Sequence, residues 1–188
     1  MPPSRSPKSV RGLSAGRRRD FSPPGHARTC AESRVDMVEF VLPNDTNTHG
    51  NVLGGRVMHW IDLAAALSAM RFSGCAMVTA SVDELHFLGP VHLGETAVLQ
   101  AEVTQAWHTS VEVQVHVHAE DMRTGVRRPT TTAYLTFAAL DEKGRPTPVP
   151  PIKLRTPAEE RRSREADVRR ARRQESRRRV LKEAGIGK

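Results

Sequence analysis

The chain has 188 residues, a formal net charge of +8 at pH 7 and only two cysteines. The length fits one domain of ordinary size with additional segments at its ends. Cys30 and Cys75 have no metal-site or redox spacing, which favours reduced thiols in an intracellular, cytoplasmic protein, and no apolar run approaches the ~18 residues of a membrane span.

The positive charge lies at the two ends of the chain. Residues 1–35 carry a net charge of +6 and residues 155–188 carry +7, whereas residues 36–154 carry −5. A nucleic-acid-binding domain would carry its positive charge on the folded part. The distribution therefore argues against a nucleic-acid partner, although binding through the basic ends stays open as an alternative.

Residues 1–34 are dense in Pro, Ser, Gly and Arg and lack hydrophobic periodicity, so we predict a disordered basic tail. An Arg- and Ser-rich transit peptide is the alternative, but the prolines disfavour the amphipathic helix that it needs. A short strand at 36–41 and a turn-rich loop follow. Residues 54–72 predict a helix that is apolar nearly all round and therefore buried, with many small residues that let another backbone approach closely.

Strands dominate the next part of the chain, at 77–87, 96–106, 110–120 and 130–140. The strand at 110–120 alternates Val111, Val113, Val115 and Val117 with Glu112, Gln114, His116 and His118, which predicts a half-solvated antiparallel strand. One buried helix against an antiparallel sheet is an α+β architecture, which we place at residues 35–154. Residues 155–188 predict a charged, solvated helical tail without a core seam, and we assign it no catalytic role.

No GxSxG, HExxH or GxxxxGK[ST] motif is present. His116 and His118 share a strand face, but no third ligand accompanies them, so we expect no metal. Cys75 is expected to be a buried structural thiol.

The stretch "NDTNTHGNVLGGRVMHWID" (44–62) ends on a carboxylate in an apolar helix. Gly54 and Gly55 open that helix, where unpaired N–H groups and a positive dipole end can stabilise an oxyanion. Asp62 lies about two turns on, roughly 11–12 Å along the axis, too far to meet a carbonyl bound at its own helix start. An antiparallel second copy could close that gap. Asp62 as a packing carboxylate, Asn47 as a turn residue and the glycines as turn or packing residues are the alternatives.

Three blocks, "LPNDTNTHGNVLGGRVMHWIDLAAALSA", "VTASVDELHFLGPVHLGE" and "AYLTFAALDEKGRPTPVPP", together resemble the hotdog-fold acyl-CoA thioesterases of the acyl-CoA hydrolase type over residues 36–152. The resemblance implies hydrolysis of acyl-CoA to a free acid and CoA, with Asp62 as the catalytic residue and Asn47 as its partner across a subunit interface. It implies that the amides of Gly54 and Gly55 polarise the thioester carbonyl. It also implies an obligatory dimer, often three dimers to a hexamer, and no cofactor, since CoA is part of the substrate.

Within this resemblance, Asp62 acts as general base on water or attacks directly to give an anhydride. Thr79 and Ser81 are similar to residues that line the CoA channel. The chain departs from the family at "GCAM" (74–77), where a basic residue is common. The CoA phosphates would then fall to other basic residues, namely Arg123, Arg127, Arg128, Lys143 or Arg145, with Arg123 and Arg128 preferred.

Three alternatives to a thioesterase remain at this point. A non-catalytic acyl-CoA binding or sensing protein could use the same fold, but it would need neither Asp62 nor Asn47. A hotdog dehydratase needs an Asp/His pair, and His59 is close enough in sequence to share a face with Asp62. A nucleic-acid-associated hotdog protein would act through its basic ends.

Overall fold

The computed structural model describes residues 25–186. The prediction of a disordered tail therefore falls largely outside the described residues, and for residues 25–34 it is wrong. This segment forms β1 (Arg28–Thr29) and the short 3-10 helix η1 (Ala31–Ser33). β1 pairs in parallel with β7 (Ile152–Lys153), and the hydroxyl of Ser33 accepts a hydrogen bond of 2.8 Å from the amide of Val103. These backbone contacts hold the segment against the sheet.

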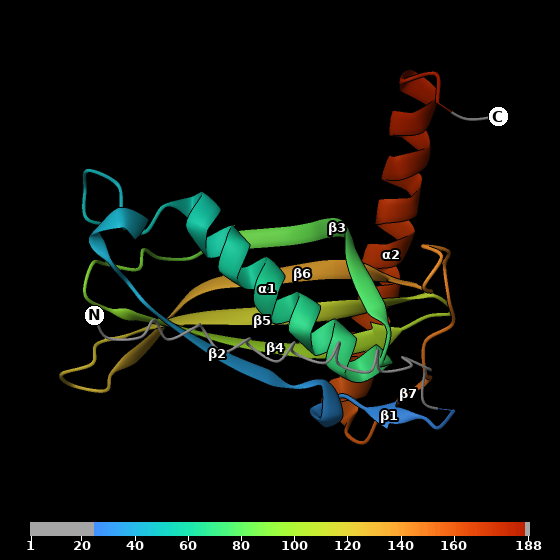
Figure 1. The fold of residues 1–188 in the computed structure, drawn as a ribbon, viewed down its shortest axis with the longest axis horizontal. Coiled ribbons are helices and arrows are strands. Elements are labelled where there is room, and N and C mark those ends of the chain that lie inside the picture. The colour runs from blue at the N-terminus through green and yellow to red at the C-terminus, as the bar shows by residue number, and fades with distance from the viewer. Residues whose placement is uncertain (1–24, 187–188) are drawn as a thin grey trace, which may run out of the picture.

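A five-stranded antiparallel sheet forms the centre of the molecule (Figure 1). Its strands run in the spatial order β2-β4-β5-β6-β3, so that β2 and β3 are the edges. They are β2 (Val35–Phe40), β3 (Ala76–Phe87), β4 (Thr96–Ala106), β5 (Ser110–Glu120) and β6 (Arg127–Leu140). The predicted α+β architecture is confirmed. Only the last strand is misplaced by more than one residue, because it begins at Arg127 and so extends the hairpin with β5.

The helix α1 (Gly54–Ser73) crosses one face of the sheet (Figure 1). It ends at Gly74, whose φ of +69° is the left-handed conformation that glycine adopts without strain. Alanines at 64, 65 and 69 are fully buried and let the helix lie close to the strands. The predicted burial all round is wrong, because one face of α1 is free in the single chain. Met58, Leu63, Leu67 and Met70 are between 39 and 50% exposed.

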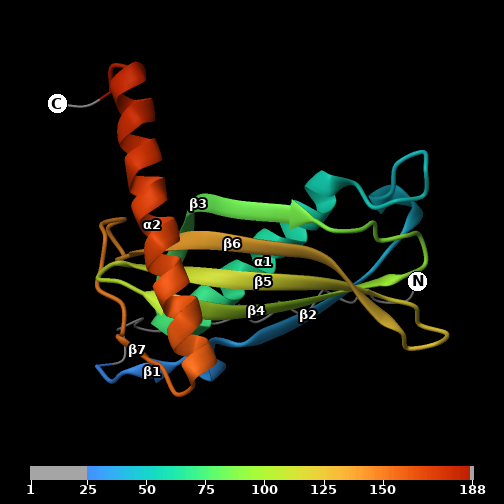
Figure 2. The same cartoon turned by 180° about the vertical axis from the view of Figure 1, so that it is seen from behind.

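A second helix, α2 (Pro157–Glu183), crosses the opposite face of the sheet (Figure 2). The helix was predicted, but the prediction that it is solvated is wrong for its first half, which buries Ser163, Ala166 and Arg169. The half-solvated state predicted for β5 is wrong for the same reason, since Glu112 and Gln114 are buried beneath α2. Both errors arise because polar side chains of α2 and β5 bury one another.

An ion pair lies at the centre of this polar contact. Arg169 donates from Nε and a terminal nitrogen to both carboxylate oxygens of Glu112, at 3.0 and 2.8 Å. Thr104 donates a further hydrogen bond of 2.7 Å to Glu112, and the guanidinium of Arg169 lies 3.8 Å from the ring centroid of Tyr134. Paired and hydrogen-bonded in this way, the two charges tolerate burial.

Candidate active site

Asp62 lies in the third turn of α1, at the margin of its free face. Its carboxylate accepts a hydrogen bond of 2.7 Å from the hydroxyl of Thr79 on β3, and the carboxylate is only partly buried. A packing carboxylate would be buried and enclosed by donors, so that alternative fits Asp62 poorly. Among residues 25–186 one donor holds the carboxylate, and its partial exposure leaves it accessible to a substrate or a water.

A β-bulge decides which side chains of β3 point toward α1. The pairing of β3 with β6 shifts between Thr79 and Ser81, so that one extra residue, Ala80, stands between them. Thr79 reaches Asp62 beneath α1, whereas Ser81 donates a hydrogen bond of 2.6 Å to Asp83. Asp83 in turn pairs with Arg173 of α2. The two hydroxyls that the sequence places together therefore lie near different helices.

The N-terminus of α1 presents free backbone donors. The amides of Arg56 and Val57 already donate to the carbonyl of Leu53, at 2.9 and 3.2 Å. Within the described part of the chain, the amides of Gly54 and Gly55 have no acceptor. Two unpaired N–H groups at the positive end of a 20-residue helix form a site for a developing negative charge.

Neither glycine of the pair is required by the chain's own packing. Both have ordinary negative φ angles, unlike Gly50, whose φ of +75° serves the preceding turn. A Cβ on Gly55 would meet no atom within 4 Å, and one on Gly54 would meet the ring of Phe87 at an ordinary 3.6 Å. The alternative that these are turn or packing glycines therefore loses its physical basis. The absent side chains leave the amides open to a ligand.

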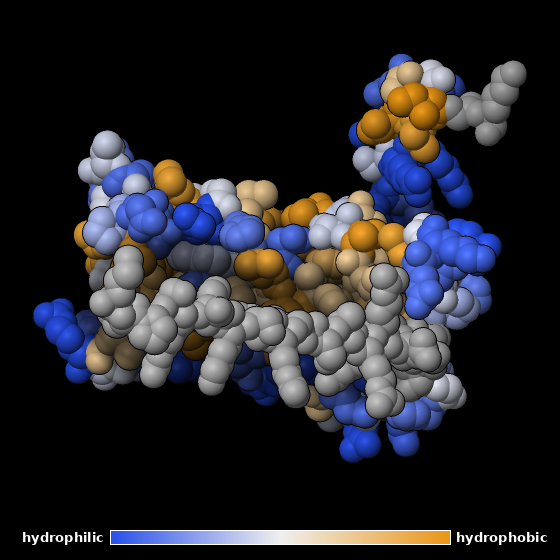
Figure 3. Space-filling view, in the orientation of Figure 1, coloured by the Kyte–Doolittle hydropathy of each residue, from blue (hydrophilic) through white to orange (hydrophobic). Residues whose placement is uncertain are grey.

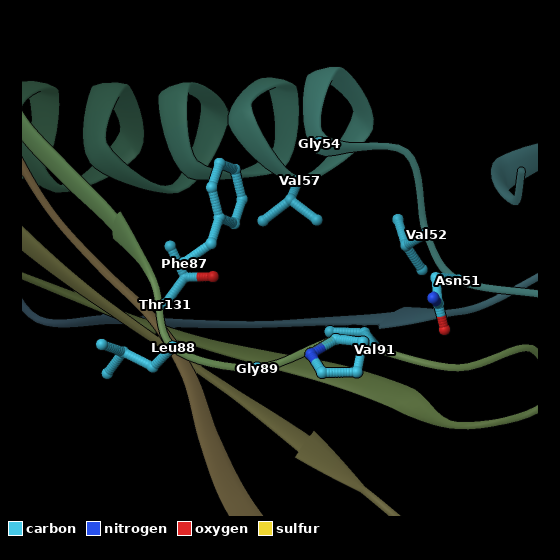
Figure 4. Close-up of a pocket in the computed structure, with 10 residues that line it drawn as sticks. Asn51, Val52, Gly54, Val57, Phe87, Leu88, Gly89, Val91 and Thr131 are labelled. Carbon is cyan, nitrogen blue, oxygen red and sulfur yellow. The ribbon is translucent and has the colours of Figure 1, made fainter.

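A pocket of about 350 Å³ lies beside this helix start (Figure 4). Figure 4 shows Gly54 and Val57 of α1 on one side of it, with the ring of Phe87 beside Val57, and Leu88 and Gly89 on the opposite side. Its lining is mostly apolar, with the side chain of Asn51 and the backbone of Gly89 at the far end. An apolar pocket that ends at free amides suits an acyl group whose carbonyl oxygen must be polarised.

Asn47 belongs to the loop that leads into α1. Its side-chain oxygen accepts from the amides of His49 and Asn51, at 2.9 and 3.2 Å. The alternative of a turn residue is therefore part of its role. The amide nitrogen of the same side chain has no acceptor among the described residues and lies at the exposed surface. Since the oxygen is occupied, the free end of Asn47 can act only as a donor.

A buried carboxylate that the sequence analysis overlooked fixes this loop to the helix. Asp45 accepts from the amide of Leu42 at 3.1 Å and pairs with Arg56 in the first turn of α1 at 2.9 Å. The amide of Leu53 donates to the backbone carbonyl of Asp45 at 2.9 Å. The sequence signal for it was its place two residues before Asn47. Asp45 holds Asn47 and the glycine pair in one rigid unit.

The chain thus carries two candidate half-sites. The carboxylate half-site consists of Asp62 and Thr79, and the glycine half-site consists of Asn47, Gly54 and Gly55. Both contain residues of α1, whose rise of 1.5 Å per residue separates Gly54 from Asp62 by about 12 Å. One chain therefore cannot bring its own two half-sites to the same carbonyl.

The predicted phosphate-binding arginines occupy different positions relative to the pocket. Arg128 pairs with Glu95 at 2.6 Å and donates to the carbonyl of Pro90, which lines the pocket. Arg123 is in the tight turn between β5 and β6 and is almost fully exposed beside Asp121. Of these two arginines, Arg128 is the one that lies near the pocket.

The remaining candidates give no second site. Among residues 25–186, no group of three or more His, Cys, Asp or Glu side chains could hold a metal ion. The ring of His116 lies 3.2 Å from the hydroxyl of Thr132, and burial lowers its pKa, assisted by His118 and Arg162. Cys75 is buried, as predicted. No helix in the described range is long and apolar enough to cross a membrane.

Comparison with known proteins places this arrangement in a family. The family model "Thioesterase superfamily" matches residues 49–126. The acyl-CoA thioester hydrolase YkhA of Bacillus subtilis, itself uncharacterized, is 42% identical over 125 residues, which are 66% of this chain and 73% of that protein. The chain spans only 33% of a longer mouse relative, the cytosolic acyl coenzyme A thioester hydrolase.

Solved structures of related proteins share the fold of this chain, and the similarity covers most of their length. An apo-hexameric acyl-CoA thioesterase has a TM-score of 0.77 at 38% identity and matches 80% of this chain and 97% of its own. An acyl-CoA hydrolase from Staphylococcus aureus, solved with butyryl coenzyme A and coenzyme A, has a TM-score of 0.76 at 34% identity, over 85% of this chain and 96% of its own. That hydrolase was also solved with alanine in place of an asparagine, an aspartate or a threonine.

Proposed function

The chain belongs to the thioesterase superfamily of hotdog-fold proteins, and on that premise we propose that it is an acyl-CoA thioesterase that hydrolyses acyl-CoA to a free carboxylic acid and CoA. The observation that carries this proposal is the pair of backbone amides at Gly54 and Gly55, which have no acceptor among the described residues, beside an apolar pocket. The cytosolic naming of a relative supports a cytoplasmic location.

The residue intervals support the assignment of the catalytic group. In the Staphylococcus aureus hydrolase, the asparagine, aspartate and threonine that were replaced by alanine are separated by 15 and 17 residues. The intervals from Asn47 to Asp62 and from Asp62 to Thr79 are also 15 and 17 residues. Substitution of these positions in a related hydrolase is expected if they belong to its active site, and all three belong to the two half-sites described above.

A dimer would join the half-sites. The free face of α1 carries Leu63, Leu67 and Met70 beside Asp62, and the neighbouring strand β3 is an edge with Val78 and Val82 exposed. An apolar patch and an unpaired strand edge together favour a two-fold contact with a second copy. Antiparallel α1 helices across that axis would bring Asp62 of one subunit to the glycine half-site of the other. Three such dimers would form a hexamer, the state named for a related structure.

In the proposed reaction, the thioester carbonyl oxygen accepts from the amides of Gly54 and Gly55 of one subunit. Asp62 of the other subunit removes a proton from a water, and the water oxygen adds to the carbonyl carbon. The resulting oxyanion is stabilised by the helix N-terminus. Its collapse breaks the carbon–sulfur bond and releases CoA thiolate, which takes up the proton. The hydrogen bond from Thr79 orients Asp62.

Asn47 would orient the reacting groups, and the arginines would bind CoA. The free amide of Asn47 is a donor and would hold the attacking water or the carbonyl. Arg128, beside the Gly89–Pro90 wall of the pocket, would contact CoA phosphates, with Arg123 and Ser81 farther from the reacting carbon as weaker candidates. Direct attack of Asp62 to form an anhydride remains the second mechanism.

Mixed dimers test the shared site. Asp62→Ala and Asn47→Ala chains are purified separately, denatured, mixed in equal amounts and refolded together, and CoA release from acyl-CoAs of several lengths is followed with a thiol reagent. Each variant alone should be nearly inactive. In the mixture, half of the dimers carry one intact and one doubly altered site, so about a quarter of wild-type activity should return. No recovery would contradict a site shared between subunits.

The same assay separates the proposal from its alternatives. A sensing protein would bind acyl-CoA of some chain length tightly without releasing CoA, and Asp62→Ala would leave its behaviour unchanged. A dehydratase would depend on His59, so activity that survives His59→Ala argues for hydrolysis. Transient labelling of Asp62 by the acyl group, detected by mass spectrometry after rapid quenching, would select the anhydride mechanism over the general base.

A further inference from the structure

The second half of α2 extends past the edge of its own sheet. Residues 174–183, here called the arm, continue the helix beyond β3, as Figures 1 and 2 both show. Apart from the partly buried Leu181, every residue of the arm is exposed. Short helices in water are marginal without tertiary packing, so a supporting surface is expected for this one.

The face of α2 that packs on the sheet continues into the arm. Ser163, Ala166, Arg169 and Arg173 point at the sheet in the first half, at helical spacing. Arg177 and Val180 follow at the same spacing and lie on the same side of the helix. The side of α2 that packs on the sheet therefore continues for two more turns beyond the edge strand β3, where the described chain provides no sheet beneath it.

A wedge-shaped cavity of about 930 Å³ lies between this stripe and the edge strand. On one side it is lined by β3 from Ala80 to Glu84, and on the other by arginines and by Val180 and Leu181 of the arm. Figure 3 shows the free-standing end of α2 rising above the body of the molecule, with apolar side chains at its tip. The wedge is open because the sheet stops at β3.

We propose that in the dimer the arm lies across the outer face of the partner subunit's sheet. This rests on the two-fold β3–β3 contact of the proposed function, which would extend the sheet directly beneath the arm. Figure 2 places α2 over the beginning of the straight part of β3. Because antiparallel pairing sets the start of one strand against the end of the other, the arm meets the second half of the partner's β3.

The chemistry of the two surfaces fits. The second half of β3 carries Glu84 and His86, whose side chains are 37 and 64% exposed and lie 3.9 Å apart, and Glu84 lines the wedge beside α2. Arg177 has no carboxylate within 4.0 Å in the described chain. Glu84 of the partner subunit would supply one, and Val180 would be buried. Each subunit thus covers the other's outer face as well as sharing its active site.

A cross-linking experiment between two distinguishable chains tests this directly. One chain carries an affinity tag and Val180→Cys, and the other, untagged, carries His86→Cys or Glu84→Cys. After coexpression and mild oxidation, only a bond between subunits gives a disulfide-linked band of mixed size. Cys30 and Cys75 are 1 and 2% exposed, and burial raises the pKa of Cys30 to about 12, so the native thiols should stay silent.

Val168→Cys in the tagged chain is the matched control. Val168 and Val180 are the same residue type on the same helix and are 52 and 55% exposed, but they lie about 120° apart around its axis, and Val168 faces away from the sheet. We expect most of the dimer to cross-link through position 180 and only background linking through position 168.

Three results would overturn the inference. Equal linking from both positions in a protein that sediments as a dimer leaves the proposed function intact and removes the arm contact. Sedimentation as a monomer removes both. Absence of the cross-link together with titration of inorganic triphosphate that Arg177→Ala abolishes would assign the wedge to a polyanion instead.

Discussion

The two faces of the central sheet are covered by helices that bind to it in opposite ways. α1 packs through alanines and other apolar side chains into a continuous core, while α2 packs through an arginine, a serine and one alanine. The packing of α1 on the inner face is stabilised by the apolar surface area that it removes from water. The stability of the outer face depends on each charge finding its partner.

This difference also distinguishes the candidate catalytic carboxylate from a structural one. The carboxylate that remains accessible, Asp62, is on the apolar helix, where a charge has few local partners. The carboxylate that is completely buried, Glu112, is paired with Arg169 and Thr104 and is 0% exposed, so a substrate cannot reach it. Glu112 therefore has a structural role, whereas Asp62 is accessible to a substrate or a water, as the proposed mechanism requires.

The largest expected effect is at Asp62. Asp62→Asn keeps the size of the side chain but removes the base, so the rate of CoA release should fall by about 10²–10⁴-fold. Thiol-detected hydrolysis measures the loss, and sedimentation together with circular dichroism should show an unchanged dimer. Substantial activity in this variant would exclude Asp62 from the chemistry.

On the outer face, the largest effect is expected in stability. Arg169→Met leaves Glu112, which is 0% exposed, without its cation, and should lower the free energy of unfolding by about 3–5 kcal/mol. Urea denaturation measures it. The double change Arg169→Met with Glu112→Leu should recover most of the loss, because no unpaired charge remains. If the double variant is no more stable than the single one, the helix is held by other contacts.

Leu67→Asp tests the free face of α1. Burial of a leucine contributes about 1.5–3 kcal/mol and a two-fold contact uses it twice, so dimer affinity should weaken by at least ~10²-fold. Analytical ultracentrifugation over a concentration series gives the dissociation constant. Val168→Asp, a similarly exposed residue on the outward side of α2, should leave the dimer unchanged.

Thr79→Val removes the one hydrogen bond that orients Asp62. A hydrogen bond to a charged group contributes about 1.5–3 kcal/mol, so kcat should fall by roughly 10-fold or more while KM changes little. Thr79→Ser keeps the hydroxyl and should restore most of the rate. A change confined to KM would instead place Thr79 in substrate binding.

The smallest expected effect is the pH dependence of the outer face. The pKa of His116 is lowered in the folded state from its usual 6.5, so the unfolded chain binds its proton more tightly. The stabilising contribution is therefore present above about pH 6.5 and is lost as the pH falls through the folded pKa. Denaturation midpoints between pH 5 and 8 should show this slope, and His116→Gln should reduce it.

Much of the fold could be predicted because its signals are local. The 3.6-residue apolar period gave α1, and the two-residue period gave β3, β4 and β5 within one residue at either end. The resemblance of three sequence blocks identified the family, and the eight-residue gap between Gly54 and Asp62 already predicted that a second chain contributes to the site.

What covers the outer face was decided only by tertiary structure. A stripe of Ser163, Ala166 and Arg169 is typical of a solvated helix, and nothing nearby in sequence satisfies the arginine. Its partner Glu112 is 57 residues away. Likewise, only the folded chain shows that the amides of Gly54 and Gly55 are unpaired and that Ser81 is turned away from Thr79 by a bulge. Apolar periodicity is a local pattern that can be read from the sequence. Which charges pair, and which hydrogen-bond donors remain without an acceptor, depends on which residues distant in the sequence come into contact.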